Sequence, residues 1–169
     1  STIQKYAAMF GLSETSGVEV YEDVPEISSR DAVRTAIGYY HNFAPVQIAK
    51  YITTVANSGT CYNLTLLDRV MDRDGNMVYH NEPDVYNEIA MFSTAQWRAV
   101  QLGMYNVVNT ASNSLNRLYG DLGVKVAGKT GTAQVSTTHP NNALFVSYAP
   151  YENPEISVVR RQISGISAR

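Results

Sequence analysis

The sequence is poor in the features that build disulfides, metal clusters and membrane spans. Its 169 residues include one cysteine, Cys61, which rules out an internal disulfide and any multi-cysteine metal site. No apolar run approaches the ~20 residues that cross a bilayer, and the first residues show no signal-peptide pattern. The net charge of −2 lacks the basic excess typical of nucleic-acid-binding proteins, so we expect no nucleic-acid partner.

What the chain does contain is an ordinary globular balance, with 44% hydrophobic and 17% charged residues. This length suits one domain or a piece of a larger one. The chain begins with "STIQKYAAMF", which has no Met and is already in a helical pattern. Such a beginning fits either an entry into the middle of a longer protein or a processed start, and the sequence leaves both open.

Apolar spacing and capping signals predict helices in the first two thirds of the chain. We expect one that ends before Gly11, a short one over residues 31–37, one that starts at Pro45 and stops before Gly59, and one that begins at Ser93. The apolar stripe of the last helix is expected to run through Trp97, Val100, Leu102, Met104 and Val107.

Alternation of apolar and polar residues predicts strands in two places. It flanks Asp74 and Gly75, a hairpin turn signal, and it resumes over residues 124–135, 143–149 and 155–159. Consecutive strands with such short links pair antiparallel. The sequence therefore predicts an α+β fold, in which helices are followed by the antiparallel edge of a sheet.

The stretch "GVKVAGKTGTAQ", residues 123–134, fits two unrelated motifs. From Gly123 to Thr130 it spells G-x-x-x-x-G-K-T, the phosphate-binding loop of nucleotide enzymes. That loop needs a buried strand before it and a helix after it. The preceding "LNRLYGDL" is not a buried strand, and no helical stripe follows Thr130, so the context argues against a nucleotide site.

From Lys129 to Gly131 the same stretch spells K-T-G, a motif of β-lactamases and penicillin-binding proteins. This motif needs a strand at a sheet edge beside a cleft. Alternation then directs Lys129 and Gly131 to one face and Thr130 and Thr132 to the other. Glycine at 131 would let another backbone approach closely, and a free strand edge can pair with an extended peptide. On the motif alone, a plain surface strand with one lysine stays an alternative.

Longer stretches resemble the end of the transpeptidase domain of class B penicillin-binding proteins, and the elongation-type members in particular. The strand "VKVAGKTGTAQ" is followed by "NNALFVSYAP" and "NPEISVV", as in that family. Upstream, "IGYYHNFAPVQIAKYITTVANSGT" is similar to the family's IGQ-x-x-x-x-TPLQLA-x-x-x-x-x-x-ANGG segment, and "YNVVN" fits its GM-x-x-VV helix. The likeness is colinear over residues 1–159.

The resemblance implies an incomplete penicillin-recognising fold, like that of the serine β-lactamases. Class B penicillin-binding proteins are D,D-transpeptidases. They cross-link peptidoglycan stem peptides through a serine acyl-enzyme, and β-lactam antibiotics trap that serine. By this likeness Lys129, Thr130, Gly131 and Thr132 bind the substrate, and Lys129 and Thr132 also take part in catalysis. Lys129 would organise the serine network, the threonine hydroxyls would hold a carboxylate, and the N–H of Thr132 would donate to the oxyanion.

The family likeness also implies a setting. We expect no cofactor and no metal. The longer protein would act outside the cytoplasm, in the periplasm or on the outer face of the cell membrane, anchored through a segment absent from this chain. It would associate with other cell-wall synthesis proteins.

Two motifs of the family are missing: S-x-x-K, whose serine is the nucleophile, and S-x-N in its family position. No serine here is followed three positions later by lysine. Ser157 is followed by Arg160, but it lies after the K-T-G strand, in the wrong order. Ser114 begins an S-x-N match that stands only a dozen residues before Lys129, so we interpret it as a coincidence. We therefore expect the chain alone to be inactive.

The last ten residues, 160–169, depart from the family. Two consecutive arginines would break a buried strand, so we assign residues 1–159 to the transpeptidase domain and residues 160–169 to an atypical tail, such as a truncation or frameshift product. Without the missing sheet partners, parts of Phe145, Val146 and Ile156 would be exposed and would favour association.

Other readings stay open. A related β-lactamase, D,D-carboxypeptidase or β-lactam sensor would share the motif, and a non-catalytic remnant or interaction module would need no nucleophile. Scattered polar residues are interpreted as structural or surface groups (His41, His80 and His139) and as turn residues (Asp72 and Asp74).

Overall fold

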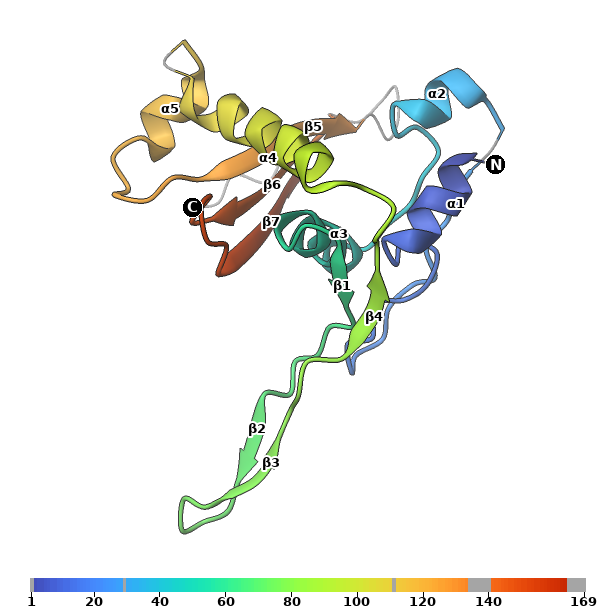
Figure 1. Cartoon of the computed structure of the whole chain (residues 1–169). Helices are drawn as coiled ribbons and strands as arrows, with labels where there is room; N and C mark the ends of the chain where they lie inside the picture. Colours follow the sequence, from blue (N-terminus) through green and yellow to red (C-terminus); the bar gives the residue numbers. More distant parts are fainter. Residues whose placement is uncertain (1, 29, 111, 134–140, 164–169) are drawn as a thin grey trace.

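A computed structural model describes residues 2–28, 30–110, 112–133 and 141–163, and it has the predicted α+β architecture (Figure 1). The five helices and two short strand pairs precede a three-stranded sheet at the end of the described chain. The elements in chain order are α1 (Thr2–Met9), α2 (Ala32–Ala36), α3 (Pro45–Ala56), β1 (Thr60–Tyr62), β2 (Arg69–Met71), β3 (Met77–His80), β4 (Val85–Glu88), α4 (Thr94–Asn109), α5 (Ser114–Tyr119), β5 (Ala127–Ala133), β6 (Asn142–Ala149) and β7 (Ile156–Ile163).

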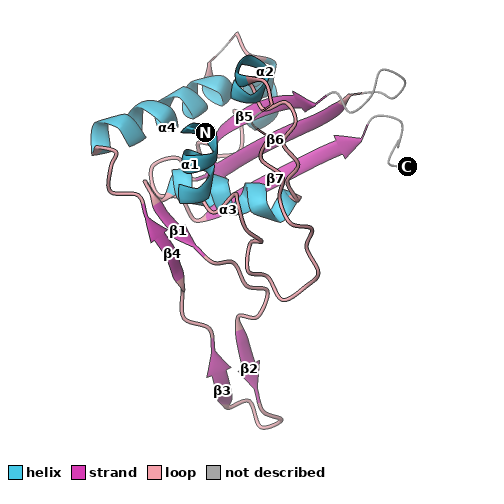
Figure 2. Cartoon of the chain, turned by 90° about the vertical axis from the view of Figure 1, so that its right-hand side faces the viewer, coloured by secondary structure: helices cyan, strands magenta, loops and turns pink. Residues whose placement is uncertain are grey.

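The body of the molecule is an antiparallel sheet in the order β5-β6-β7 with two helices packed against it (Figure 2). Helix α4 contacts β5, while α3 contacts β6 and β7. The core lies between these layers, because the buried cluster joins residues of both helices to one face of the sheet. Its members include Ile52, Val55, Trp97, Met104, Ala127, Val146 and Tyr148.

Local signals set the starts of both packed helices. Pro45 is the first residue of α3, where its fixed φ suits a helix and its missing N–H leaves no donor unpaired. Ser93 caps α4 as predicted: its hydroxyl accepts from the N–H of Gln96 at 3.3 Å, and the Gln96 side chain accepts from the Ser93 N–H at 2.8 Å.

The buried face of α4 differs in part from the predicted stripe. Trp97 and Met104 are buried, but Val100 and Leu102 are 51% and 49% exposed. The face that packs continues instead to Val108, one helical turn beyond Met104. The prediction was wrong at Val100 and Leu102 because positions three and five after Trp97 do not both fall on one face of a helix with a period of 3.6 residues.

A long hairpin arm, formed by β2, β3 and the turn between them, projects from the body (Figures 1 and 2). Its strands are paired antiparallel around Asp74–Gly75, as the sequence predicts. The Asp72 carboxylate accepts hydrogen bonds from the N–H groups of Asp74 and Asn76 and from the Asn76 side chain, which lower the pKa of Asp72. Turn chemistry therefore accounts for both aspartates.

The predicted break at the two arginines is wrong for the described part of the tail. β7 continues through Arg160 and Arg161, which pair with Phe145 and Leu144 and are exposed. The strand tolerates both arginines because it lies at an edge of the described sheet, where long charged side chains reach water. The expected boundary between residues 159 and 160 falls inside β7, and residues 164–169 lie outside the described residues.

The prediction that Phe145, Val146 and Ile156 are exposed is confirmed for only part of these residues. Ile156 is 64% exposed, whereas Phe145 is half-buried and Val146 is buried in the core cluster. Val146 was predicted wrongly because its face of the sheet packs on helices that belong to this chain. Ile156 lies on the opposite face, as its pairing with Ala149 indicates.

Candidate active site

The K-T-G-T residues lie on β5, an edge strand of the sheet. β5 pairs with β6 in an unbroken antiparallel register, with Lys129 opposite Val146 and Thr130 opposite Phe145. Within the described part of the chain, no strand pairs with the other edge of β5. The predicted antiparallel pair is therefore confirmed, although the strand starts only at residue 127 and residues 134–135 lie outside the described residues.

This strand excludes the phosphate-loop interpretation. That loop would require a helix beginning at Thr130, with its N–H groups directed at the phosphates. Thr130 lies instead in the middle of β5, which continues as a strand to Ala133. The nucleotide alternative is thus rejected by the backbone conformation itself.

The side chains of the motif divide between the two faces of β5. Directly paired residues share a face, so Lys129 and Gly131 lie on the side of Val146, and Thr130 and Thr132 lie on the other side with Phe145. Lys129, Thr130 and Thr132 are all exposed, and the accessibility predicted for Lys129 is confirmed.

The chemistry of this edge suits an anionic, extended ligand. The Lys129 ammonium donates to the carbonyl of Thr130 at 2.7 Å, which folds the lysine back along its own strand. The hydroxyls of Thr130 and Thr132 lie on the opposite face of the same strand, and within the described residues no other strand pairs with its outer edge. Ammonium and hydroxyl donors bind carboxylates, and a strand edge can add a peptide as a further strand.

β5 changes from buried to exposed along its length. Ala127 is fully buried, while the strand beyond Gly128 is open to solvent apart from the half-buried Gly131. Tyr148 of β6 pairs with Ala127 and is buried. Its hydroxyl has no hydrogen-bond partner among the described residues. Burial, and to a smaller extent Tyr151, raises the pKa of Tyr148 to about 12. One end of the strand is therefore fixed in the core and the other is exposed to solvent.

Gly128, the second glycine of the rejected phosphate-loop pattern, has a packing role that its place in that pattern did not predict. A Cβ built there would lie 2.7 Å from Cζ of Phe145 and 2.9 Å from the carbonyl oxygen of Val146. The Phe145 ring in turn stacks on Tyr119, with centroids 5.6 Å apart. A Cβ at Gly131, by contrast, would meet Cβ of Leu144 at 3.5 Å, an ordinary contact. Packing within the described residues thus requires glycine at 128, and the role of Gly131 toward a peptide stays a prediction.

We expect Gly128→Ala to lower the free energy of unfolding by about 2 kcal/mol, the usual cost of overpacking. The added methyl group would push the Phe145 ring and the backbone of β6 away from β5. Chemical unfolding followed by circular dichroism measures the effect, with Gly131→Ala as the matched control. Equal stability of the two variants would contradict the close packing at 128.

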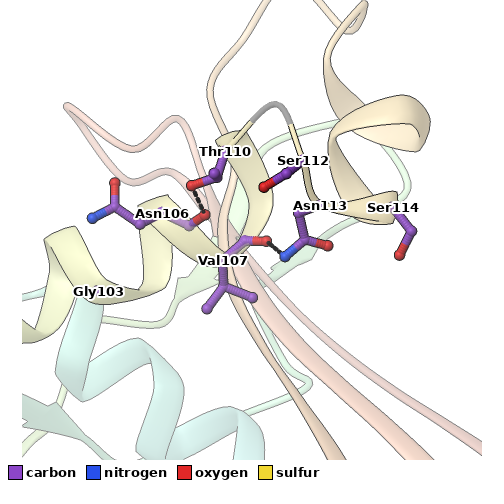
Figure 3. A pocket seen from close by; sticks show the side chains of 7 residues that line it. All are labelled: Gly103, Asn106, Val107, Thr110, Ser112, Asn113 and Ser114. Atoms are coloured by element: carbon purple, nitrogen blue, oxygen red, sulfur yellow. Dashed lines mark hydrogen bonds between the residues drawn. The ribbon is translucent and has the colours of Figure 1, made fainter.

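Ser114 lies apart from the K-T-G-T strand in a polar depression between α4 and α5. The depression is shown in Figure 3 and is lined by Gly103, Asn106, Val107, Thr110, Ser112, Asn113 and Ser114. None of the four motif residues of β5 lines it. Ser114 is the first residue of α5, whose cap is Asn113, so the S-x-N match stands in a helix start.

The other singled-out polar residues have structural surroundings where they are described. The Ser157 hydroxyl forms a 2.7 Å hydrogen bond with that of Thr53, which joins β7 to α3. His41 accepts from the N–H of Ser28 at 3.3 Å and lies 3.2 Å from the carbonyl of Thr35. His80 is exposed on the hairpin arm, and His139 lies outside the described residues.

Two further findings concern the described residues only. They contain no group of three or more His, Cys, Asp or Glu side chains placed to hold a metal ion. None of their helices has both the length and the hydrophobicity required to cross a membrane.

Comparison with known proteins gives one consistent family. Residues 1–161 match the penicillin-binding protein transpeptidase domain. The peptidoglycan D,D-transpeptidase MrdA of Haemophilus influenzae is 30% identical over 180 residues, covering 88% of this chain and 27% of that protein. The chain therefore spans about a quarter of the length of the curated relatives it matches.

Solved structures agree on the fold. Penicillin-binding protein 2B of Streptococcus pneumoniae strain R6 superposes with a TM-score of 0.80 at 24% identity, covering 93% of this chain and 28% of that one. Penicillin-binding protein 2 of Helicobacter pylori, solved in complex with MreC, gives a TM-score of 0.73 at 22% identity, covering 94% and 31%.

Proposed function

The chain belongs to the penicillin-binding protein transpeptidase domain family, and from this premise we propose that it is the C-terminal part of an elongation-type, class B peptidoglycan D,D-transpeptidase. The observation that carries the proposal is the position of K-T-G-T on an accessible strand that, among the described residues, is paired on one edge only. We call the longer protein that joins this chain to a serine nucleophile the parent protein.

In the proposed reaction, this chain forms one wall of the active site. A serine from another part of the parent attacks the carbonyl carbon of a stem peptide, the terminal amine leaves, and an amine of a second stem peptide later displaces the serine. Lys129 holds positive charge beside that serine. Thr130 and Thr132 bind the substrate carboxylate through their hydroxyls, and Gly131 leaves room for the peptide backbone.

The N–H of Thr132 is proposed as one of the oxyanion donors, the other being supplied by the serine residue. A preorganised donor of this kind stabilises the transition state by about 3–4 kcal/mol. The same site would bind β-lactam antibiotics, whose carboxylate and reactive carbonyl copy those of the stem peptide. No step requires a metal or a cofactor.

The setting of the parent follows from the same proposal. Its substrate lies outside the cytoplasm, so we place the enzyme there, anchored to the membrane through a segment outside this chain. Other cell-wall synthesis proteins are the proposed partners, and the complex of the Helicobacter pylori relative with MreC supports this class of partner.

A labelling gel with a fluorescent penicillin tests the proposal. We expect a covalent band from the parent, blocked by prior incubation with unlabelled penicillin, and no band from the isolated 169 residues. An unlabelled parent would remove the transpeptidase assignment. A band from the isolated chain would mean that the nucleophile lies within it, with Ser114 as the first residue to replace.

The fate of the label separates the related alternatives. A transpeptidase should keep the penicilloyl group for many minutes, because water is excluded as the acyl acceptor. Rapid loss of the label with turnover would indicate a β-lactamase. Release of the terminal residue from a stem peptide, without any transfer to an added amine, would indicate a D,D-carboxypeptidase.

A further inference from the structure

We propose that Asn109 is a positioning residue for the K-T-G-T strand. Its side-chain amide ties the end of helix α4 to Val126, the residue before β5, and so sets where Lys129 and Thr132 stand in the proposed active site. This inference rests on the proposed function, and it names a residue outside the motif on which the geometry of that site depends.

The contacts of Asn109 join two elements through one group. Asn109 is the last residue of α4, and its amide nitrogen donates to the carbonyl of Tyr105 and to the carbonyl of Val126, each at 2.8 Å. An amide nitrogen carries two protons, so both donors are used. Val126 is 7% exposed and directly precedes β5, so its carbonyl has little access to water.

The backbone of Asn109 is itself held by neighbouring asparagines. The Asn116 side chain donates to the Asn109 carbonyl at 3.3 Å, and the Asn113 side chain donates to the carbonyl of Val107, one of the bonds drawn in Figure 3. The connection between α4 and α5 therefore fixes the helix end from which Asn109 reaches the strand.

A second amide holds the same helix elsewhere. Gln101 donates from its side chain to the carbonyls of Val55 and Ala56, at 2.9 and 3.3 Å, which belong to the last turn of α3. Gln101 precedes Asn109 by eight residues, about 12 Å along the helix. The two amides make the same kind of bond, but of the two it is that of Asn109 that holds the residue directly before β5.

The position of the bond explains its effect on the site. Lys129 stands three residues beyond Val126, about 10 Å along an extended strand. β5 is paired on one edge only within the described residues, so β6 and α4 are what hold it. A misplacement of about 1 Å in a catalytic group can cost a factor of about 100 in rate.

Four versions of the parent protein test the inference: wild type, Asn109→Ala, Gln101→Ala and Asn106→Ala. The last replaces an exposed asparagine on the same helix. The acylation rate constant at saturating penicillin is measured separately from the dissociation constant of the complex that precedes acylation, well below the melting temperature. Hydrogen exchange of residues 124–133 and the melting temperature are measured on the same samples.

We expect Asn109→Ala to reduce the acylation rate constant about tenfold and to speed hydrogen exchange in residues 124–133. Gln101→Ala should lower the melting temperature without either effect, and Asn106→Ala should change nothing. If Asn109→Ala lowers only the melting temperature, as Gln101→Ala does, the inference is overturned. If wild type takes no label, the proposed function fails, and unchanged exchange in Asn109→Ala would then overturn this inference independently.

Discussion

In the parent protein, Lys129→Ala and Thr132→Ala should each slow acylation by penicillin by a factor of about 100 to 1,000 while leaving the fold intact. Both side chains are exposed on the outer half of β5, so neither replacement creates a cavity. What is lost is the charge beside the proposed serine in one variant and a hydroxyl for the substrate carboxylate in the other.

The measurement is the rate of label incorporation at several penicillin concentrations, with circular dichroism as the test of folding. Lys125→Ala is the matched control, because it removes the same charge from an exposed lysine just before β5. Acylation that stays at the wild-type rate in both site variants would show that the ligand binds away from this strand.

The second large effect is expected at Lys50, which is only 1% exposed within α3. Its ammonium donates to the carbonyl of Ser16 at 3.3 Å and to Oδ1 of Asn63 at 2.8 Å, and it lies 4.2 Å from the centre of the Tyr86 ring. Lys50→Ala would leave a cavity and two unpaired acceptors. We expect the free energy of unfolding to fall by about 3 kcal/mol.

Lys50→Met separates volume from charge, because methionine fills most of the same space without a proton. Burial lowers the pKa of Lys50, with weaker opposing effects from Cys61, Glu14, Glu22 and Asp84. The folded state therefore releases the proton at a lower pH than the unfolded state, whose lysine has a pKa of about 10.4. Stability should rise with pH between those two values, and Lys50→Met should flatten that rise.

Chemical unfolding at a series of alkaline pH values measures this slope, with Lys5→Met, at an exposed position on α1, as the control. An identical slope in wild type and Lys50→Met would contradict the burial of a charged lysine. Full stability of Lys50→Ala would show that Ser16 and Asn63 find other partners.

Short-range sequence signals determine where several helices and turns of this fold begin. The proline at the start of α3, the capping box at Ser93 and the Asp74–Gly75 turn each act within a few residues, and each was predicted. The strand nature of K-T-G-T was likewise predictable, because alternation on both sides of a loop specifies a paired strand.

What the sequence could not supply are contacts between distant residues. Gly128 is required because the Phe145 ring lies against it, and the amide of Asn109 reaches a carbonyl seventeen residues away. The burial of Lys50 depends on a loop thirty-four residues upstream. No periodic pattern contains these pairings, because they exist only after the chain has packed.

The hairpin arm has a consequence for how the protein can vary. β2 and β3 make their principal contacts with each other, and all seven of their residues are exposed. Opening or lengthening the arm therefore does not disturb the layers that hold β5. The arm can therefore change in length and sequence around Asp74 without altering the packing of α3 and α4 on the sheet, so loop grafting or a peptide tag at this turn should leave the strand that carries Lys129 in place.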